Sequence, residues 1–208
     1  PNLSQVIDTY TPTNYNELNQ QDEDLGSASP VMLPKQEMSN TPYMAVQAGK
    51  DEKVRLLNRQ NLSGQGGPNH VGDELQSVDL PQGCGVLTQP VAWNEANGIT
   101  WVFVTNGCGL SAFKVSTDTS GHTSLQVVYT NQDSGSSPFI ANGVLFVQDN
   151  QVLRALNPST GVTLWSSNSP SAGGPIGSLH WESPIVVNGV VYVPDDDGAL
   201  TAYNLART

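Results

Sequence analysis

Short apolar segments separated by polar turns recur along the chain. Residues 137–147, Ser-Pro-Phe-Ile-Ala-Asn-Gly-Val-Leu-Phe-Val, match residues 183–193, Ser-Pro-Ile-Val-Val-Asn-Gly-Val-Val-Tyr-Val, at almost every position. After each copy comes a polar turn and then a second apolar segment, at 152–156 and 199–203. Self-similarity at a regular spacing is typical of repeat architectures, in which neighbouring units stack to bury a common core.

Looser copies of the same unit lie upstream and begin at Pro30 and Pro90. The two clear copies contain Pro138 and Pro184, and the four prolines are 60, 48 and 46 residues apart. Each unit holds short runs of β-branched and aromatic residues bounded by Gly, Asn, Asp or Pro, a pattern that predicts three or four strands. Four antiparallel strands in about 45–50 residues are typical of a β-propeller blade.

Two dipeptides predict the geometry of the tightest turns. Asn142-Gly143 and Asn188-Gly189 each separate two apolar runs. A type I′ hairpin turn needs positive φ at both central residues, and Asn-Gly adopts it at little steric cost. We therefore expect a β-hairpin at each dipeptide.

The pattern as a whole predicts an all-β fold, a β-propeller with about four blades of four antiparallel strands. Residues 1–208 are expected to form a single, partial propeller domain. The repeat units are expected at about 27–62, 86–130, 136–168 and 183–205. Residues 11–26, with one helical turn at most, and residues 61–76, rich in glycine, are expected as inserted loops. Ser4–Thr9 is expected to be an outer strand without its partners, and the chain to end at Leu205 after a third strand.

Composition narrows the class of protein. Charged residues make up only 13% of the chain, about half the usual share, which excludes a coiled coil or a charge-rich disordered tail. The net charge is −11, which argues against nucleic-acid backbones and anionic membranes as partners. No apolar run approaches the roughly 18 residues that a membrane span needs.

The two cysteines, Cys84 and Cys108, are predicted to form a disulfide. In a four-stranded meander, the loop leading into the first strand and the turn between the second and third strands open on the same face of the disc. Cys84 lies in the first of these segments and Cys108 in the second, and glycines flank both. A disulfide is typical of an oxidising compartment. Two reduced, buried thiols are the alternative.

Residues 155–165, Ala-Leu-Asn-Pro-Ser-Thr-Gly-Val-Thr-Leu-Trp, resemble the tryptophan-docking motif of quinoprotein propellers. In that motif an Ala and a Trp on neighbouring blades interlock, and a Thr-Gly turn joins the third strand to the fourth. The resemblance implies a structural docking role for Ala155, Thr160, Gly161 and Trp165. Asn157 stands where the motif usually has Asp. From about residue 11 to 205, the chain is similar to the pyrroloquinoline-quinone (PQQ)-binding-like β-propeller repeat proteins.

This resemblance implies a secreted or cell-envelope protein. Propellers of the group usually carry seven or eight blades, so we expect the C-terminal portion of a larger disc, with the remaining blades supplied by the same or another chain. The enzymes of the superfamily clamp PQQ between a Trp and a disulfide of adjacent cysteines, beside Ca²⁺ and a catalytic Asp. This sequence has no adjacent cysteines, and we expect no catalytic residues and no bound PQQ or Ca²⁺.

Two further segments contain candidate ligand-binding residues. In Asp195-Asp196-Asp197-Gly198, Asp195 and Asp197 are candidate metal ligands, but a solvated hairpin turn is the favoured alternative because Ca²⁺ takes ligands from alternating positions. His180 and Trp181 precede the first strand of the last unit, near the propeller axis. They are candidate ligand contacts on the axial face; the alternative is that they pack in a loop between blades.

We expect a secreted or cell-surface propeller that acts as a non-catalytic binding or scaffold module for a protein or glycan partner. The rival hypothesis is a PQQ-dependent dehydrogenase whose cofactor site lies in blades outside this chain. Fold alone does not choose between them.

Overall fold

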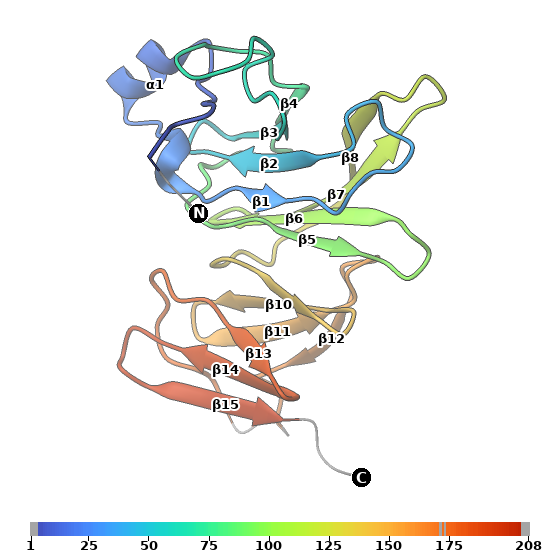
Figure 1. Cartoon of the computed structure of the whole chain (residues 1–208). Helices are drawn as coiled ribbons and strands as arrows, with labels where there is room; N and C mark the ends of the chain where they lie inside the picture. Colours follow the sequence, from blue (N-terminus) through green and yellow to red (C-terminus); the bar gives the residue numbers. More distant parts are fainter. Residues whose placement is uncertain (1–3, 171, 173, 205–208) are drawn as a thin grey trace.

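The computed structural model describes residues 4–170, 172 and 174–204. Four antiparallel sheets follow one another in chain order (Figure 1). The first sheet contains β1 (Val31–Met32), β2 (Met44–Ala48), β3 (Lys53–Asn58) and β4 (Gln76–Asp79); the second contains β5 (Val91–Asn94), β6 (Thr100–Asn106), β7 (Gly109–Thr117) and β8 (Thr123–Asn131); the third contains β9 (Phe139–Ala141), β10 (Val144–Asp149), β11 (Val152–Leu156) and β12 (Thr163–Ser166); the fourth contains β13 (Ile185–Val187), β14 (Val190–Pro194) and β15 (Leu200–Asn204). A short helix, α1 (Tyr15–Gln21), and a 3₁₀ turn, η1 (Leu25–Ser27), precede them.

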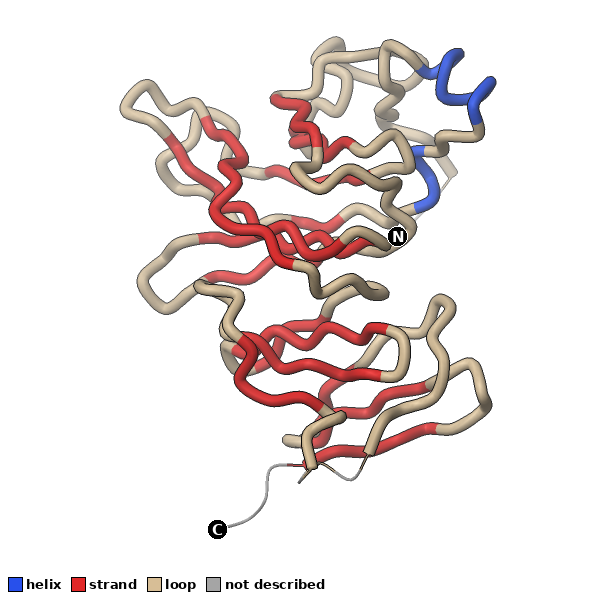
Figure 2. The backbone as a smooth tube through the Cα atoms, turned by 180° about the vertical axis from the view of Figure 1, so that it is seen from behind, coloured by secondary structure: helices blue, strands red, loops and turns tan. Residues whose placement is uncertain are grey.

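Each sheet is a simple meander, because strands that are consecutive in the chain are also hydrogen-bonded neighbours. The first strands of successive sheets, β1, β5, β9 and β13, contact one another. Strands are the main regular structure, and helix is confined to the N-terminal end (Figure 2). The all-β propeller architecture predicted from the sequence is confirmed.

Both Asn-Gly dipeptides form the predicted hairpin turns. Asn142 and Gly143 have φ of 49° and 72°, and Asn188 and Gly189 have φ of 52° and 78°. Positive φ at both central residues is the mark of a type I′ turn. These turns set the register between β9 and β10 and between β13 and β14.

Three apolar layers between the sheets make the core. The second sheet shows the arrangement best, because every residue of β6 is buried. Val102 and Val104 pack toward the first sheet, whereas Trp101 and Phe103 pack toward the third. The third layer joins the third and fourth sheets. A strand covered on both faces needs no polar alternation, which explains the continuous apolar run in β6.

The fourth sheet has one covered and one exposed face. Val191 and Val193 of β14 are buried against the third sheet. On the other face, Ile185, Val187 and Leu200 are 49%, 47% and 66% exposed. Among the described residues, no sheet covers this apolar face.

The outer face of the first sheet is covered by the chain's own N-terminal part. Its buried side chains are Ala45, Gln47, Arg55 and Leu57. The Gln47 side-chain amide donates to the carbonyl oxygens of Leu25 and Ala28, at 3.0 and 2.8 Å. The Arg55 guanidinium pairs with the Asp51 carboxylate, and these side chains are 2% and 4% exposed. The α1 end of the molecule lies beyond this sheet (Figure 1).

Residues 4–9 do not form the outer strand expected from the sequence. The outer edge of the first sheet is already occupied by β4, so this segment has no edge to join there. Instead, the Asp8 carboxylate accepts the N–H of Leu62 at 2.7 Å. The Thr9 hydroxyl accepts the N–H of Asn69 at 2.9 Å. The segment is therefore held by the loop that precedes β4.

Two expected boundaries also change. The glycine-rich loop lies within the first blade, between β3 and β4, so this blade extends to Asp79 and not to residue 62. The 11–26 segment contains seven helical residues, not one turn, and α1 is anchored by Leu18, which is 4% exposed. The expected end at Leu205 lies outside the described residues.

Candidate functional site

A pocket of about 250 Å³ opens on the face where loops lead into the first strands of the sheets. We call it the loop-face pocket, and we call the segment before each sheet's first strand its lead-in loop. The pocket is lined by residues 85, 87–88, 106–107, 134–137, 149–150 and 179–181. These segments are lead-in loops of the second, third and fourth sheets and hairpin turns of the second and third. The site therefore belongs to three blades.

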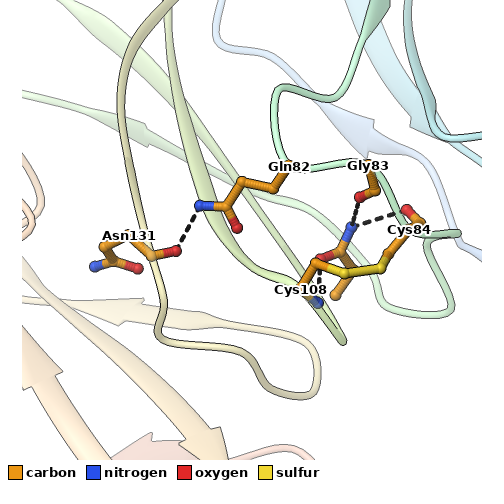
Figure 3. Close-up of a disulfide and its surroundings, with 6 residues drawn as sticks. Gln82, Gly83, Cys84, Cys108 and Asn131 are labelled. Atoms are coloured by element: carbon orange, nitrogen blue, oxygen red, sulfur yellow. Dashed lines mark hydrogen bonds between the residues drawn. A yellow bond between two sulfur atoms is a disulfide. The ribbon is translucent and has the colours of Figure 1, made fainter.

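The disulfide predicted from the sequence joins Cys84 to Cys108 beside this pocket, with the two Cα atoms 6.0 Å apart (Figure 3). It ties the lead-in loop of the second sheet to the turn between β6 and β7. Asn106 makes the same connection, because its side-chain NH₂ donates to the carbonyl oxygens of Gly83 and Cys84, at 2.8 and 2.9 Å. Gln82 extends the contact to the carbonyl oxygen of Asn131, at 2.6 Å (Figure 3).

The third sheet holds its lead-in loop by charge. The Arg154 guanidinium lies 3.2 Å from a carboxylate oxygen of Asp133, in the lead-in loop. It also lies 3.3 Å from Asp149, at the end of β10. The three side chains are only about one-quarter exposed. One arginine thus bridges the lead-in loop and the β10–β11 hairpin.

In the fourth sheet the candidate metal ligands hold the lead-in loop. Asp195 accepts the N–H groups of Gly177 and Ala199, at 3.1 and 2.8 Å. Asp197 accepts the N–H of Ser178, at 2.8 Å. Among the described residues, no group of three or more His, Cys, Asp or Glu side chains is placed to hold a metal ion. Asp195 and Asp197 therefore already accept hydrogen bonds from backbone N–H groups of the protein.

His180 and Trp181, the candidate axial-face residues, line the loop-face pocket. Both are exposed, and Trp181 retains 59% of its accessible surface. Their ring centroids are 4.5 Å apart with an interplanar angle of 31°. The Glu182 carboxylate accepts both backbone N–H groups, from His180 at 2.7 Å and Trp181 at 3.0 Å. These hydrogen bonds lower the pKa of Glu182 below its ordinary value, and the bond from His180 has the largest effect.

The docking motif is arranged differently from the interlock that the resemblance implied. Ala155 and Trp165 are cross-strand partners within the third sheet, on β11 and β12. The turn that contains Gly161 instead meets Tyr129 of the second sheet, whose hydroxyl donates to the Pro158 carbonyl at 2.7 Å. The interlocking aromatic from the preceding blade is therefore a tyrosine.

Trp165 makes the corresponding contact with the next blade. Its ring packs edge-on against Tyr203 of β15, with centroids 5.1 Å apart. Both residues lie in the layer between the third and fourth sheets. Thr160 stands in the turn itself, where its backbone N–H donates to the Asn157 carbonyl at 3.3 Å.

A second depression, of about 610 Å³, lies at the N-terminal end and opens widely to solvent. Tyr10, Tyr15 and Leu25 are among its lining residues. Most of its lining belongs to the inserted segment 11–26, and none of the candidate site residues named from the sequence lines it. The loop-face pocket, which contains the predicted His180 and Trp181, is the better candidate site.

Sequence reasoning missed three residues of the site: Asn106, Asn150 and Glu182. Asn106 and Asn150 stand where a second strand ends in its hairpin turn, a position that recurs in each repeat. That position was the available signal. No sequence signal pointed to Glu182, because a carboxylate that accepts the backbone N–H groups of the two preceding residues produces no repeating pattern in the sequence.

Successive meander sheets whose first strands contact one another define the class as β-propeller repeat proteins. The family model described as outer membrane protein assembly factor BamB matches residues 91–207. Because this match covers more than half of the chain, the chain belongs to that family. Comparison with curated protein sequences gives no significant match.

Solved structures show the same fold at low sequence identity. BamB from Moraxella catarrhalis is 13% identical with a TM-score of 0.50, over 86% of this chain and 46% of that one. The β-propeller domain of Cps50 (Swd1) from Myceliophteria thermophila is 10% identical with a TM-score of 0.52, over 97% and 56%. The computationally designed Ika4 protein is 10% identical with a TM-score of 0.50, over 86% and 91%. The chain spans about half the length of the two natural proteins.

No helix within residues 4–170, 172 and 174–204 has the length and apolar character to cross a membrane.

Proposed function

We propose that this chain is part of a non-catalytic β-propeller scaffold of the cell envelope or extracellular space, and that its loop face binds a partner. The Cys84–Cys108 disulfide supports an oxidising compartment. The family description, an outer membrane protein assembly factor, supports the envelope as the setting.

The observation that carries the proposal is the exposed pair of rings at the loop-face pocket. Large aromatic side chains are usually mostly buried, whereas exposed ones concentrate at binding surfaces. Trp181 is 59% exposed in a loop that Glu182 fixes. The covalent bridge between Cys84 and Cys108 joins the two segments that contribute Gly85 and Gly107 to the lining of the same pocket. A pocket with fixed walls loses little conformational entropy when a partner binds.

The exposed face of the fourth sheet supports a second element of the proposal, a further blade. Both faces of the second and third sheets are covered by neighbouring sheets. The exposed Ile185, Val187 and Leu200 occupy the face on which the next sheet of a propeller packs. The scaffold is therefore completed by a sheet of the same kind, from this polypeptide or another.

The described residues do not fit a quinone clamp. The disulfide beside the pocket joins cysteines from two different loops, so it lacks the flat ring of an adjacent pair. Asp195 and Asp197 already accept backbone N–H groups. These residues argue against a quinone site at the loop-face pocket of this chain.

Site-specific photo-crosslinking tests the proposed face. A photo-reactive amino acid at Leu87, which lines the pocket and is 43% exposed, is compared with one at Met38, outside the pocket and 81% exposed. In cells of the native host, position 87 is expected to capture one defined partner and position 38 none. The capture should be lost in Trp181→Ala. Equal capture at both positions, or capture that does not depend on Trp181, would contradict the proposal.

A further inference from the structure

We propose that the loop-face pocket binds one unit of a neutral oligosaccharide, with the Trp181 indole as its stacking surface. This inference rests on the proposed function, because it names the ligand class for the face already proposed to bind. Four properties of the pocket support it: a fixed aromatic surface, hydroxyl and amide walls, an arginine that is already shared by two carboxylates, and a position at the ends of strands.

The aromatic surface is exposed and held in place. Trp181 lines the pocket with 59% of its surface accessible, and His180 lies beside it with its ring centroid 4.5 Å away. Glu182 fixes the backbone of both residues through two N–H bonds. One face of a pyranose ring carries mainly C–H groups, which pack on an aromatic face as other apolar groups do. The structure thus presents a platform before any ligand arrives.

The walls carry neutral hydrogen-bonding groups. Ser134, Ser137 and Asn150 line the pocket. The Ser137 hydroxyl oxygen accepts the N–H of Gln89 at 2.8 Å, and the side-chain amide oxygen of Asn150 accepts the N–H of Leu179 at 3.4 Å. These bonds leave the Ser137 hydroxyl proton and the Asn150 NH₂ to donate. Sugar hydroxyls both accept and donate, and they match such a wall.

The charges near the pocket disfavour an anionic ligand. Asp149, which lines the pocket, pairs with Arg154, and Arg154 also pairs with Asp133. The only guanidinium in this cluster is therefore shared by two carboxylates. With a net charge of −11 on the chain, an anionic glycan or a phosphate is repelled at long range.

The position of the pocket argues against an extended peptide. A peptide that adds a strand needs a free sheet edge, whereas this pocket is built from lead-in loops and hairpin turns at the ends of strands. Its volume of about 250 Å³ is below the range of about 300–1,000 Å³ found for drug-sized ligands. It suits one sugar unit, with the rest of the oligosaccharide extending into solvent.

Isothermal titration calorimetry of the full chain tests the inference. The probes are tetramers of β-1,4-linked glucose, β-1,4-linked N-acetylglucosamine and α-1,4-linked glucose, with a sulfated oligosaccharide and an unstructured peptide for comparison. We expect at least one neutral tetramer to bind. Trp181→Ala should weaken that binding about tenfold or more, because the stacking surface is removed. Circular dichroism of the variant checks that the fold is kept.

Two further variants test whether a loss of binding comes from the Trp181 stacking surface or from a change in the fold. Tyr43→Ala removes an aromatic that is 38% exposed but lies outside the pocket, and it should leave the affinity unchanged. Glu182→Gln should weaken binding by less than Trp181→Ala and broaden the Trp181 indole N–H signal in NMR spectra, because a neutral amide accepts the two N–H groups less strongly. Equal affinity in Trp181→Ala and the unsubstituted chain would overturn the inference.

The outcomes also distinguish this inference from the proposed function. If no neutral tetramer binds, or if only the sulfated oligosaccharide or the peptide binds, the ligand class is wrong. If position 87 still captures a partner in a Trp181-dependent manner, the binding face stands without the sugar. If the crosslinking fails as well, both proposals are wrong.

Discussion

The Tyr129 hydroxyl donates a hydrogen bond to the Pro158 carbonyl oxygen across the boundary between the second and third sheets, at 2.7 Å. Gly161, in the same turn, has a φ of 73°, and a Cβ atom added there would lie 2.6 Å from Cε2 of Tyr129. The ring can rest on the turn only because Gly161 has no side chain. Burial raises the pKa of Tyr129, so its hydroxyl remains a donor.

Gly161→Ala should therefore lower the free energy of unfolding by about 1–3 kcal/mol, through positive-φ strain and the clash with Tyr129. Gly98→Ala is the matched control, since Gly98 also has positive φ, at 87°, but no atom within 4 Å of the added Cβ. Urea denaturation should show the smaller loss at Gly98. Equal losses would mean that contact with Tyr129 contributes nothing.

Replacing both cysteines by serine should cost about 3 kcal/mol, because the disulfide closes a loop between residues 24 positions apart. Reductant should lower the urea midpoint of the unsubstituted chain and leave that of the double variant unchanged. Alkylation of native material without reductant provides an independent check. Modification of Cys84 and Cys108 under those conditions would show that the disulfide is absent in the cell.

Removing the acidic partner of the buried ion pair in the first sheet should destabilise the protein far more than removing that of an exposed ion pair. Asp51→Ala leaves the Arg55 guanidinium, at 2% exposed, without its carboxylate, and should cost about 3–5 kcal/mol. Lys35 and Glu37 form a pair at 46% and 72% exposed, so Glu37→Ala should leave the stability almost unchanged. Thermal denaturation of the two variants provides the comparison. A similar effect at both sites would contradict the burial argument.

The Trp181 loop should lose order in acid. The pKa of Glu182 in the folded state lies below its ordinary value of 4.5, because the ionised carboxylate accepts N–H groups from His180 and Trp181. Its contribution is therefore complete above pH 4.5 and is lost as the pH falls through the lower, folded-state pKa. The Trp181 indole N–H signal should broaden over that interval. Glu182→Gln should abolish this transition, and an unchanged transition would assign it to another group.

The sequence was sufficient to predict the propeller, since Asn-Gly turns and apolar runs are local signals that specify strands and hairpins directly. It was also sufficient for the disulfide, because meander topology alone places Cys84 and Cys108 on one face. The fourth strand of the first sheet was missed because the long loop after β3 hides its link to that blade. Strand pairing across such a loop is a tertiary property.

The site was only partly predictable. His180 and Trp181 could be placed near the axis, but their exposure depends on how three blades pack. Tyr129 was missed because its partner turn lies in the next repeat, and the motif supplies an expected tryptophan in its place. Asp195 and Asp197 have the composition of a cation loop, yet their partners are backbone N–H groups that no composition reveals.

The first and fourth sheets, at the two ends of the stack, differ in how well their outer faces are covered, so local unfolding is expected to start more easily at one end. When units contact only their neighbours, the free energy needed to open a unit falls toward the less covered end. The first sheet is covered on both faces, whereas the fourth exposes Ile185, Val187 and Leu200. Until the further blade proposed above covers that face, the fourth sheet is therefore the one expected to open first. The loop-face pocket is lined by loops of the second, third and fourth sheets. A ligand bound there would therefore link the fourth sheet to its two neighbours and oppose its opening.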